Sequence, residues 1–367
     1  MAAGVWKEAG SIARRLYDDG VPTTPPRRQI TFVGIITVVA GAALFAWLVT
    51  TVKPAVIWSS FRQIGWNLGW IVALGGLRFA VRGAAWMLCI ESPHSLPFGS
   101  AFNAVVCGDA LGNATPLGPL VGEPAKIAYV RGRVPVGPAL TALAIENVFY
   151  TLSVAAMIAA GAMALLFSVE LPLGLREFSE VAIAAIVLLF IAAGWVLWRR
   201  PAVVDTLLRA RRRSAGAAAP NSARIASKVE RLRVAEREVF TFASRRRRVL
   251  APLIMLELVF HALGVAEKHL TLWLILPSPP TLLTSFIIET ADRLITVAFK
   301  FVPFQVGFGE AGTGLITNIL GLTTAPGVTL SIVRKARMGI WSLVGTGLLI
   351  RRGLTARRVL EDPELNG

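Results

Sequence analysis

Pro116-Leu-Gly-Pro-Leu-Val-Gly122-Glu123 and Pro303-Phe-Gln-Val-Gly-Phe-Gly309-Glu310 share one pattern, a proline followed after five residues by Gly-Glu. Both stretches lie among apolar segments, so each places a carboxylate where burial is costly. Proline and glycine also interrupt a continuous helix at both places. A repeated, broken element with an acidic residue at membrane depth is typical of a transport site.

The composition of the chain around these motifs is that of a protein with several membrane spans. Hydrophobic residues make up 54% of the 367 residues, and the mean hydropathy is +0.62. A soluble domain of this length is less apolar. The apolar runs are continuous rather than alternating, which predicts an all-α polytopic bundle and not a barrel. The six clearest spans are expected near residues 30–51, 68–90, 137–167, 179–198, 250–276 and 327–350.

The positive charge is concentrated between two of these spans. The net charge is +16, and residues 199–248 hold 15 Arg or Lys against 4 Asp or Glu. Because the run Arg245–Arg248 abuts a span, it indicates the cytoplasmic side and attraction to anionic lipid. We expect no nucleic-acid binding, since no recognisable nucleic-acid module accompanies the charge. The basic ends of the chain place both termini in the cytoplasm.

Two glycine-broken regions, 96–130 and 281–321, lie between the clear spans. Counting crossings from the basic segments makes the first begin and end on the cytoplasmic side and the second on the outside. This parity predicts two inverted repeats, and we favour re-entrant hairpins over pairs of full spans. The predicted organisation is a cytoplasmic segment 1–28, a first half 29–198, a basic connector 199–248, a second half 249–351 and a cytoplasmic tail 352–367.

The two carboxylates of the repeated motif are the first candidates for function. Glu123 and Glu310 would bind a cation, a proton or a lipid head group, or gate access to a site. In the alternative interpretation each carboxylate only caps a half-helix, by accepting hydrogen bonds from the N–H groups that the break leaves free.

Basic side chains within the spans are the second set of candidates. Arg78 and Arg82 lie four residues apart and share a helix face. Buried arginines that face a cavity can hold a lipid phosphate through paired hydrogen bonds, or they can pair with buried glutamates. The candidate lipid or ion site comprises Glu123, Glu310, Arg78, Arg82, Lys126, Asn113, Arg334 and Arg337, and the candidate broken elements comprise Pro116, Gly122, Pro303 and Gly309.

Other polar groups in the spans have local interpretations. Glu289 and Arg293 are spaced for an ion pair on one helix. Glu257 and His261 share a helix face, but the spacing of a zinc site is absent, so we expect no metal and no cofactor. A proton-handling role for His261 stays open. Because no Walker A motif and no nucleophile elbow are present, we expect no enzymatic activity, although acid–base chemistry by the carboxylates is a weaker alternative.

The two broken motifs also match a known pattern. Asn113-Ala-Thr-Pro-Leu-Gly-Pro-Leu-Val-Gly-Glu123-Pro-Ala-Lys126 resembles the Asn…Pro…Gly-Glu-x-x-Arg signature of the lysylphosphatidylglycerol synthase transmembrane region, and Pro303 to Gly312 resembles the second signature of that family. The chain departs from the pattern at Lys126, where the family usually has Arg, and at Glu146-Asn147, where Glu-Arg is usual. The soluble aminoacyltransferase domain is not expected here, so lipid lysinylation is not implied.

The resemblance implies a flippase-like protein of the bacterial inner membrane that moves a polar or anionic lipid between leaflets. A competing hypothesis is a membrane subunit or scaffold that recruits a soluble lipid-modifying or glycosyl-transferring enzyme through residues 199–248. Membrane lipids are the expected partners under both hypotheses, and the sequence leaves the lipid and the oligomeric state open.

Overall fold

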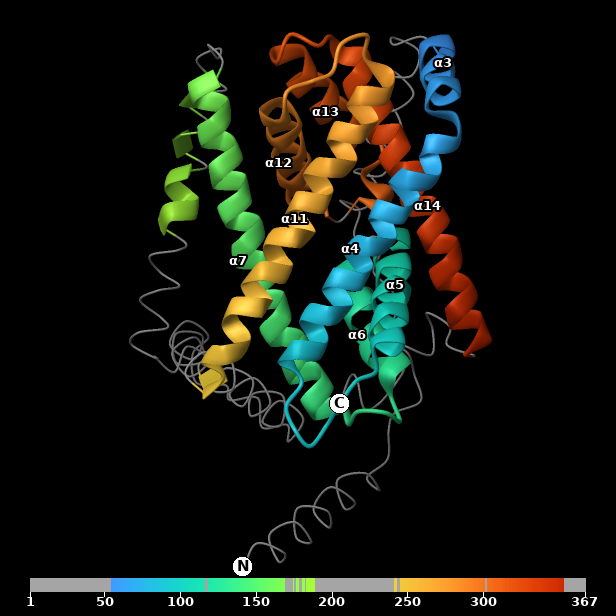
Figure 1. Ribbon diagram of the computed structural model, residues 1–367, viewed down its shortest axis with the longest axis vertical. Coiled ribbons are helices and arrows are strands. Elements are labelled where there is room, and N and C mark those ends of the chain that lie inside the picture. The colour runs from blue at the N-terminus through green and yellow to red at the C-terminus, as the bar shows by residue number, and fades with distance from the viewer. Residues whose placement is uncertain are drawn as a thin grey trace, which may run out of the picture.

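The computed structural model describes residues 54–115, 118–168, 241–242, 245–300 and 302–352, together with parts of 174–188. Every regular element within these residues is a helix, which confirms the predicted all-α class (Figure 1). The predicted span 30–51 and most of the basic connector lie outside the described residues, as does Pro116. The predicted span 179–198 is described only over a few residues up to 188.

Two series of helices run through the described chain. The first contains α3 (Pro54–Ile64), the short η1 (Gly65–Asn67), α4 (Leu68–Cys89), α5 (Phe98–Ala114), α6 (Gly118–Val130) and α7 (Val136–Ser168). The second contains α11 (Arg247–Ile275), α12 (Leu282–Ala298), the short η2 (Pro303–Gln305), α13 (Phe308–Ile319) and α14 (Thr324–Arg351).

Three helical stretches of the described chain are long and apolar enough to cross a membrane: Arg62–Cys89, Val136–Ser168 and Arg247–Ile275. They correspond to three of the predicted spans. α14 has 28 residues, which is long enough for a hydrocarbon core of about 30 Å. Near its middle, however, it carries three cations within about one helical turn: Arg334, Lys335 and Arg337. Large apolar side chains, including Trp66, Trp70 and Trp273, are exposed on the outer surface, as a lipid-facing protein requires.

Each glycine-broken region is a pair of short helices. In the first, α5 and α6 pack along each other, and glycines let their backbones touch: a Cβ added to Gly122 would lie 2.7 Å from the carbonyl oxygen of Gly108. Gly112 and Gly118 form a second such contact one turn along. Small residues four apart permit this close approach of membrane helices. In the second pair, η2 and a glycine turn join α12 to α13.

The helices of the two series pack in matching pairs. α4 packs against α11, α5 against α14, and α12 against α7. The hairpin α5–α6 lies in the lower half of Figure 1, and α12 and α13 lie in the upper half. One contact is unequal: α13 packs closely along α14, whereas α6 touches α7 at few points.

The buried apolar residues form two main cores, one around each hairpin. The larger core joins α5 and α6 to α4, α7 and the beginning of α11 around Trp86. The other joins α12 and α13 to the ends of α7 and α11 around Ile288. Charged residues occupy the space between the two cores and build the site described next.

Candidate functional site

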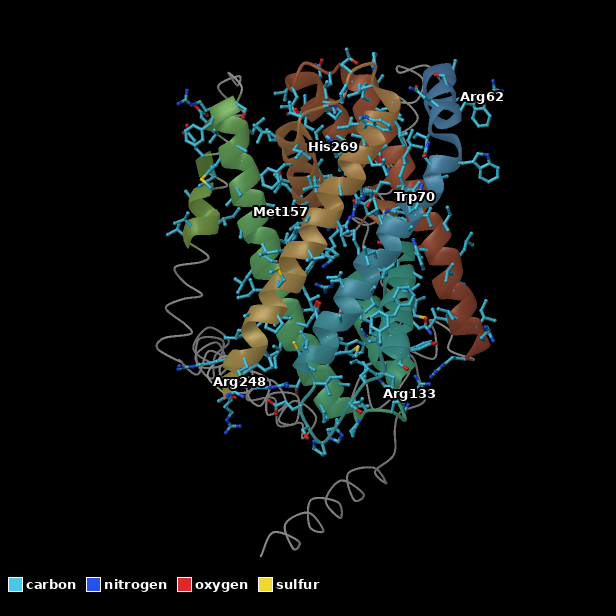
Figure 2. All side chains as sticks on the ribbon, in the orientation of Figure 1. Arg62, Trp70, Arg133, Met157, Arg248 and His269 are labelled. Atoms are coloured by element: carbon cyan, nitrogen blue, oxygen red, sulfur yellow. The ribbon has the colours of Figure 1, made fainter. Side chains whose placement is uncertain are left out.

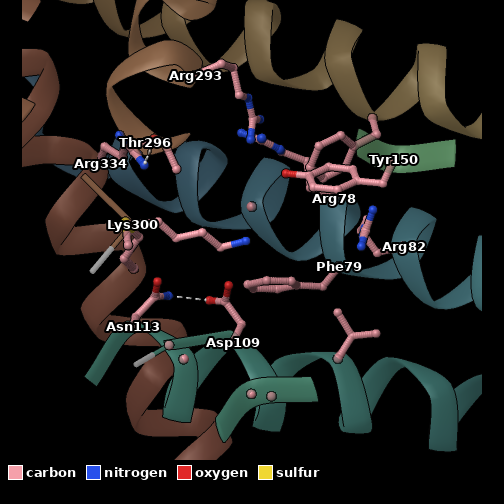
Figure 3. Close-up of a pocket in the computed structure, with 18 of the residues that line it drawn as sticks. Arg78, Phe79, Arg82, Asp109, Asn113, Tyr150, Arg293, Thr296, Lys300 and Arg334 are labelled. Carbon is pink, nitrogen blue, oxygen red and sulfur yellow. Dashed lines mark hydrogen bonds between the residues drawn. The ribbon is translucent and has the colours of Figure 1, made fainter. Parts of the chain in front are cut away.

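A cavity of about 420 Å³ lies where the two hairpins meet. Asn113 and Gly118, on either side of the first break, line it, as do Phe304 and Gln305 of the second turn. Figure 3 shows α4 crossing between the side chains that reach in from both hairpins. Segments of both series therefore converge on one site.

The lining of this cavity is strongly charged and has an excess of basic groups. Among the lining residues, eight are Arg or Lys and five are Asp or Glu, an excess of three positive charges. Seven of the eight residues predicted for the site line the cavity: Arg78, Arg82, Asn113, Glu123, Lys126, Arg334 and Arg337. Only Glu310 lies elsewhere.

Arg78 of α4 connects the two series across the cavity wall. Its guanidinium lies 3.2 Å from Glu267 and 3.7 Å from Glu289. Arg337 of α14 is 2.8 Å from the other oxygen of Glu267. Arg293 is 2.9 Å from Glu289, which confirms the ion pair predicted from their spacing. Each cation in this group thus has a carboxylate neighbour and still borders the cavity.

Arg82 lies one turn further along α4 and makes a separate set of contacts. It is 2.8 Å from Glu146 and 4.0 Å from Glu257, and it donates a hydrogen bond of 3.3 Å to Asn147. Its guanidinium also stacks over the Tyr150 ring at 3.8 Å. A charged group held by an aromatic face and two carboxylates is well oriented before any ligand arrives.

Asp292 of α12 is held between two cations. Arg334 donates to it at 2.5 Å, and Lys268 is 2.9 Å away. Arg334 continues to the Thr296 hydroxyl at 3.0 Å and to the Gln305 side chain at 3.2 Å, which ties α14 to the second turn. Lys268 and Asp292 were not among the residues predicted for the site.

Glu123, the carboxylate of the first motif, faces the cavity. Its side chain is 34% exposed, and it accepts hydrogen bonds from Lys126 at 2.8 Å and from Asn147 of α7 at 3.1 Å. Gly122 beside it serves the backbone contact with α5. Because Glu123 lines the cavity and is partly exposed, a ligand in the cavity can reach its side chain, as the functional interpretation requires.

Glu310, the carboxylate of the second motif, is placed differently. It is fully buried, accepts a hydrogen bond of 2.9 Å from the Gly307 N–H and pairs with Lys335. It does not line the cavity. Its position in the first turn of α13 lets it cap that helix, which is the structural alternative that the sequence left open.

Lys300 is a lining residue that sequence reasoning missed. It follows the end of α12, and in Figure 3 its side chain extends into the cavity between Arg334 and Phe79. No carboxylate of the described residues lies within ion-pair distance of its ammonium group. Its position three residues before Pro303 could have identified it as a site residue, because a cation next to a broken helix at membrane depth has few structural uses.

The turn that carries this part of the lining has an unusual backbone. Phe304 and Gln305 both have a φ of 51°, a left-handed conformation that costs non-glycine residues free energy. Gln305 is buried and its side chain accepts from Arg334 and Thr296. These bonds offset the backbone cost and fix the second turn at the cavity.

Comparison with known families agrees with this arrangement. The family model for the lysylphosphatidylglycerol synthase TM region matches residues 33–345, which include both hairpins and all of the cavity lining. The chain belongs to this family. No curated protein and no solved structure gives a significant match. Membership in the lysylphosphatidylglycerol synthase TM family indicates a membrane protein that acts on lipids.

In this member of the lysylphosphatidylglycerol synthase TM family, the different placement of the two motif carboxylates predicts that their substitutions have different effects on stability. Glu310→Gln should lower the free energy of unfolding by about 2 kcal/mol, because it removes a buried charge-assisted bond to Lys335. Glu123→Gln should cost about 1 kcal/mol or less, since its side chain is partly exposed. Thermal unfolding in detergent would compare them, and equal losses would contradict the assigned difference.

Proposed function

We propose that the protein binds the head group of an anionic lipid in this cavity and moves it between the leaflets. The observation that carries the proposal is the lining itself: eight cations and five carboxylates at the meeting point of two hairpins, inside a bundle whose outer surface is apolar. Charged groups are placed at membrane depth at a cost, so they are retained for a function.

The basic groups are suited to a phosphate. Arg78, Arg82 and Arg334 present planar donor groups that bind phosphate oxygens in pairs, and Lys300 adds a positive charge that forms no ion pair with a described carboxylate. The carboxylates that now pair with the arginines would exchange partners when an anion enters. A net excess of positive charge on the lining favours an anionic head group over a zwitterionic or cationic one.

The mouth of the cavity is suited to the acyl chains. Thr151 of α7 and Lys300 are both lining and exposed, so the cavity reaches the surface between α7 and the second turn. Val148 and Val297 beside them are exposed apolar residues. A lipid can then place its head group among the cations while its chains stay in the hydrocarbon outside.

We further infer that the two series are inverted repeats whose hairpins enter from opposite faces. The matching pairs α5 with α14 and α12 with α7 support this symmetry, and the hairpins lie in opposite halves of the molecule (Figure 1). In a transporter with two equivalent repeats, one hairpin would pack closely on its long helix while the other stands apart from it. The close contact of α13 with α14 and the sparse contact of α6 with α7 would then correspond to a state open to one side of the membrane. Exchange of these two arrangements would move the opening from one leaflet to the other.

The distribution of basic residues supports a proposed orientation in the inner membrane. Arg133 and Arg248 lie at the same end of the molecule, and Arg62 lies at the other (Figure 2). By the positive-inside rule the end with Arg133 and Arg248 would face the cytoplasm. We propose a multi-pass protein with the first hairpin entering from that side and with cytoplasmic termini.

Lipid exchange in liposomes tests the proposal. Phosphatidylcholine vesicles that carry trace fluorescent phosphatidylglycerol would be quenched from outside, and the protein should make the inner label accessible. Lys300→Gln should slow this exchange at least several-fold because it removes a lining cation that forms no ion pair with a described carboxylate, and Lys300→Arg should retain most of the exchange. Arg62→Gln, an exposed change on α3 far from the cavity, is the matched control.

Three outcomes decide between the functions. Faster exchange of phosphatidylglycerol than of labelled phosphatidylcholine supports an anionic lipid as substrate. Equal exchange of both lipids would contradict the selectivity and leave a general scramblase. No exchange of either lipid by folded protein would contradict translocation and favour a scaffold for a soluble enzyme.

A further inference from the structure

A second polar cluster lies beside the cavity, formed by Ser153 of α7 with Glu257 and His261 of α11. The Ser153 hydroxyl donates to a Glu257 oxygen at 3.0 Å, and the same hydroxyl oxygen lies 3.0 Å from His261 Nε2. Glu257 and His261 are both buried, with His261 8% exposed. The lipid-binding role proposed above uses none of these three side chains.

Three acceptors compete for the single proton of the Ser153 hydroxyl: the Tyr150 carbonyl oxygen at 2.8 Å, and Glu257 and His261 Nε2 at 3.0 Å each. A serine hydroxyl carries one proton, so when it donates to Glu257 or to the Tyr150 carbonyl oxygen it must accept from His261. His261 is then protonated at Nε2, and its Nδ1 carries a lone pair. Nδ1 is buried and has no hydrogen-bond partner among the described residues. The cluster therefore has a buried basic nitrogen at one end and a carboxylate at the other, joined by one hydroxyl.

The charge around Glu257 is not balanced locally. Arg82 lies between Glu146 and Glu257, nearer to Glu146, so two carboxylates share one cation. Arg78 and Arg293 lie over the Phe260 ring beside this cluster, at 4.6 and 5.0 Å from its centroid. These two arginines have their own partners, Glu267 and Glu289. Tyr150 of α7, which stacks on Arg82, and Glu123 of α6 are the other titratable groups that interact with Arg82.

Arg82 connects this cluster to the cavity, because it lines the cavity and also lies 4.0 Å from Glu257. An anion that binds Arg82 competes with Glu257 for its charge. A buried carboxylate that loses its cation is costly unless it gains a proton. The proton rests on Glu257, and the Ser153 hydroxyl links this carboxyl to His261.

We propose that the Ser153–Glu257–His261 cluster binds one proton when an anionic head group binds Arg82, so that lipid and proton cross the membrane together. This inference rests on the proposed function and adds its energy source. The proton is taken from water on the side to which the cavity is open and released on the other side with the lipid. By linkage, each ligand must strengthen the binding of the other by the same factor.

An imposed pH gradient tests the coupling in the same vesicles. One proton per phosphatidylglycerol should bias the distribution of the labelled lipid about tenfold for each pH unit across the membrane. Glu257→Gln and His261→Gln should lose this bias, so that rates with and without the gradient become equal. The matched control is His269→Gln, because His269 also bonds a serine, Ser285 at 3.0 Å, outside the cluster.

A second measurement detects the proton site without lipid exchange. Infrared difference spectra of the purified protein, with and without short-chain phosphatidylglycerol, should show a protonated-carboxyl band that Glu257→Gln removes and His269→Gln keeps. If either cluster variant fails to fold, Ser153→Ala breaks the link without changing charge and should also remove the bias.

The two measurements separate this inference from the function on which it rests. Exchange that ignores the gradient in the wild type, with no carboxyl band, would overturn the proton site and leave lipid transport standing. A carboxyl band with no exchange would support ligand-linked proton binding and overturn translocation.

Discussion

Gly122→Ala should destabilise the protein by about 3 kcal/mol, and Gly122→Val should prevent the first hairpin from forming. A Cβ at this position would lie 2.7 Å from the carbonyl oxygen of Gly108, and backbone atoms cannot rotate away as a side chain can. α5 and α6 would have to separate, which also displaces Glu123 and Lys126 from the cavity. Thermal unfolding in detergent measures the loss.

Gly339→Ala on α14 is the control for this prediction. Gly339 lies within a helix and has open space around its Cβ position. Alanine there should stabilise the protein by up to about 1 kcal/mol, because glycine is the poorer helix former. A shift of the same sign and size in both variants would show that the Gly122 contact does not hold the hairpin.

Asp292→Asn should lower the free energy of unfolding by about 3–5 kcal/mol, because it breaks a buried ion pair and leaves two cations uncompensated. Arg334 and Lys268 both lose their carboxylate, and the Lys268 side chain is only 3% exposed. Denaturation followed by tryptophan fluorescence would measure the change.

A double-mutant cycle makes the Asp292 prediction sharper. Lys268→Met should cost less than Asp292→Asn, since Asp292 keeps Arg334, and adding it to Asp292→Asn should recover part of the loss. Glu180→Gln removes an exposed pair with Arg176 and should cost less than about 1 kcal/mol. A loss from Asp292→Asn as small as that of Glu180→Gln would contradict the buried network.

Hydropathy and glycine placement were sufficient to predict most of the described fold. The span expected at 68–90 is the helix Leu68–Cys89, and the region 96–130 is broken between Ala114 and Gly118 as the prolines and glycines require. These features depend on local composition, so one sequence reveals them. The six-span count and the repeat symmetry depend on segments outside the described residues and remain predictions.

Partner choice among the charges could not be predicted in the same way. Arg78 pairs with Glu267, 189 positions away, and periodicity carries no information about that contact. The two Gly-Glu motifs also look equivalent in the sequence, yet Glu123 faces the cavity and Glu310 caps α13. The difference arises from neighbours: Lys335 approaches Glu310 from α14, whereas Asn147 approaches Glu123 from α7.

The glycine contacts have a mechanical consequence for this site. α5 touches α6 through backbone at Gly122, and it touches α14 through backbone at Gly345, where an added Cβ would lie 2.7 Å from the Val106 carbonyl oxygen. Without a layer of side chains between them, these three helices cannot slide past one another and must turn as one body. Arg334 and Arg337 on α14 and Glu123 on α6 are carried by that body. A head group that displaces the arginines would therefore also move Glu123, and the Asn147 bond of 3.1 Å links that carboxylate to α7.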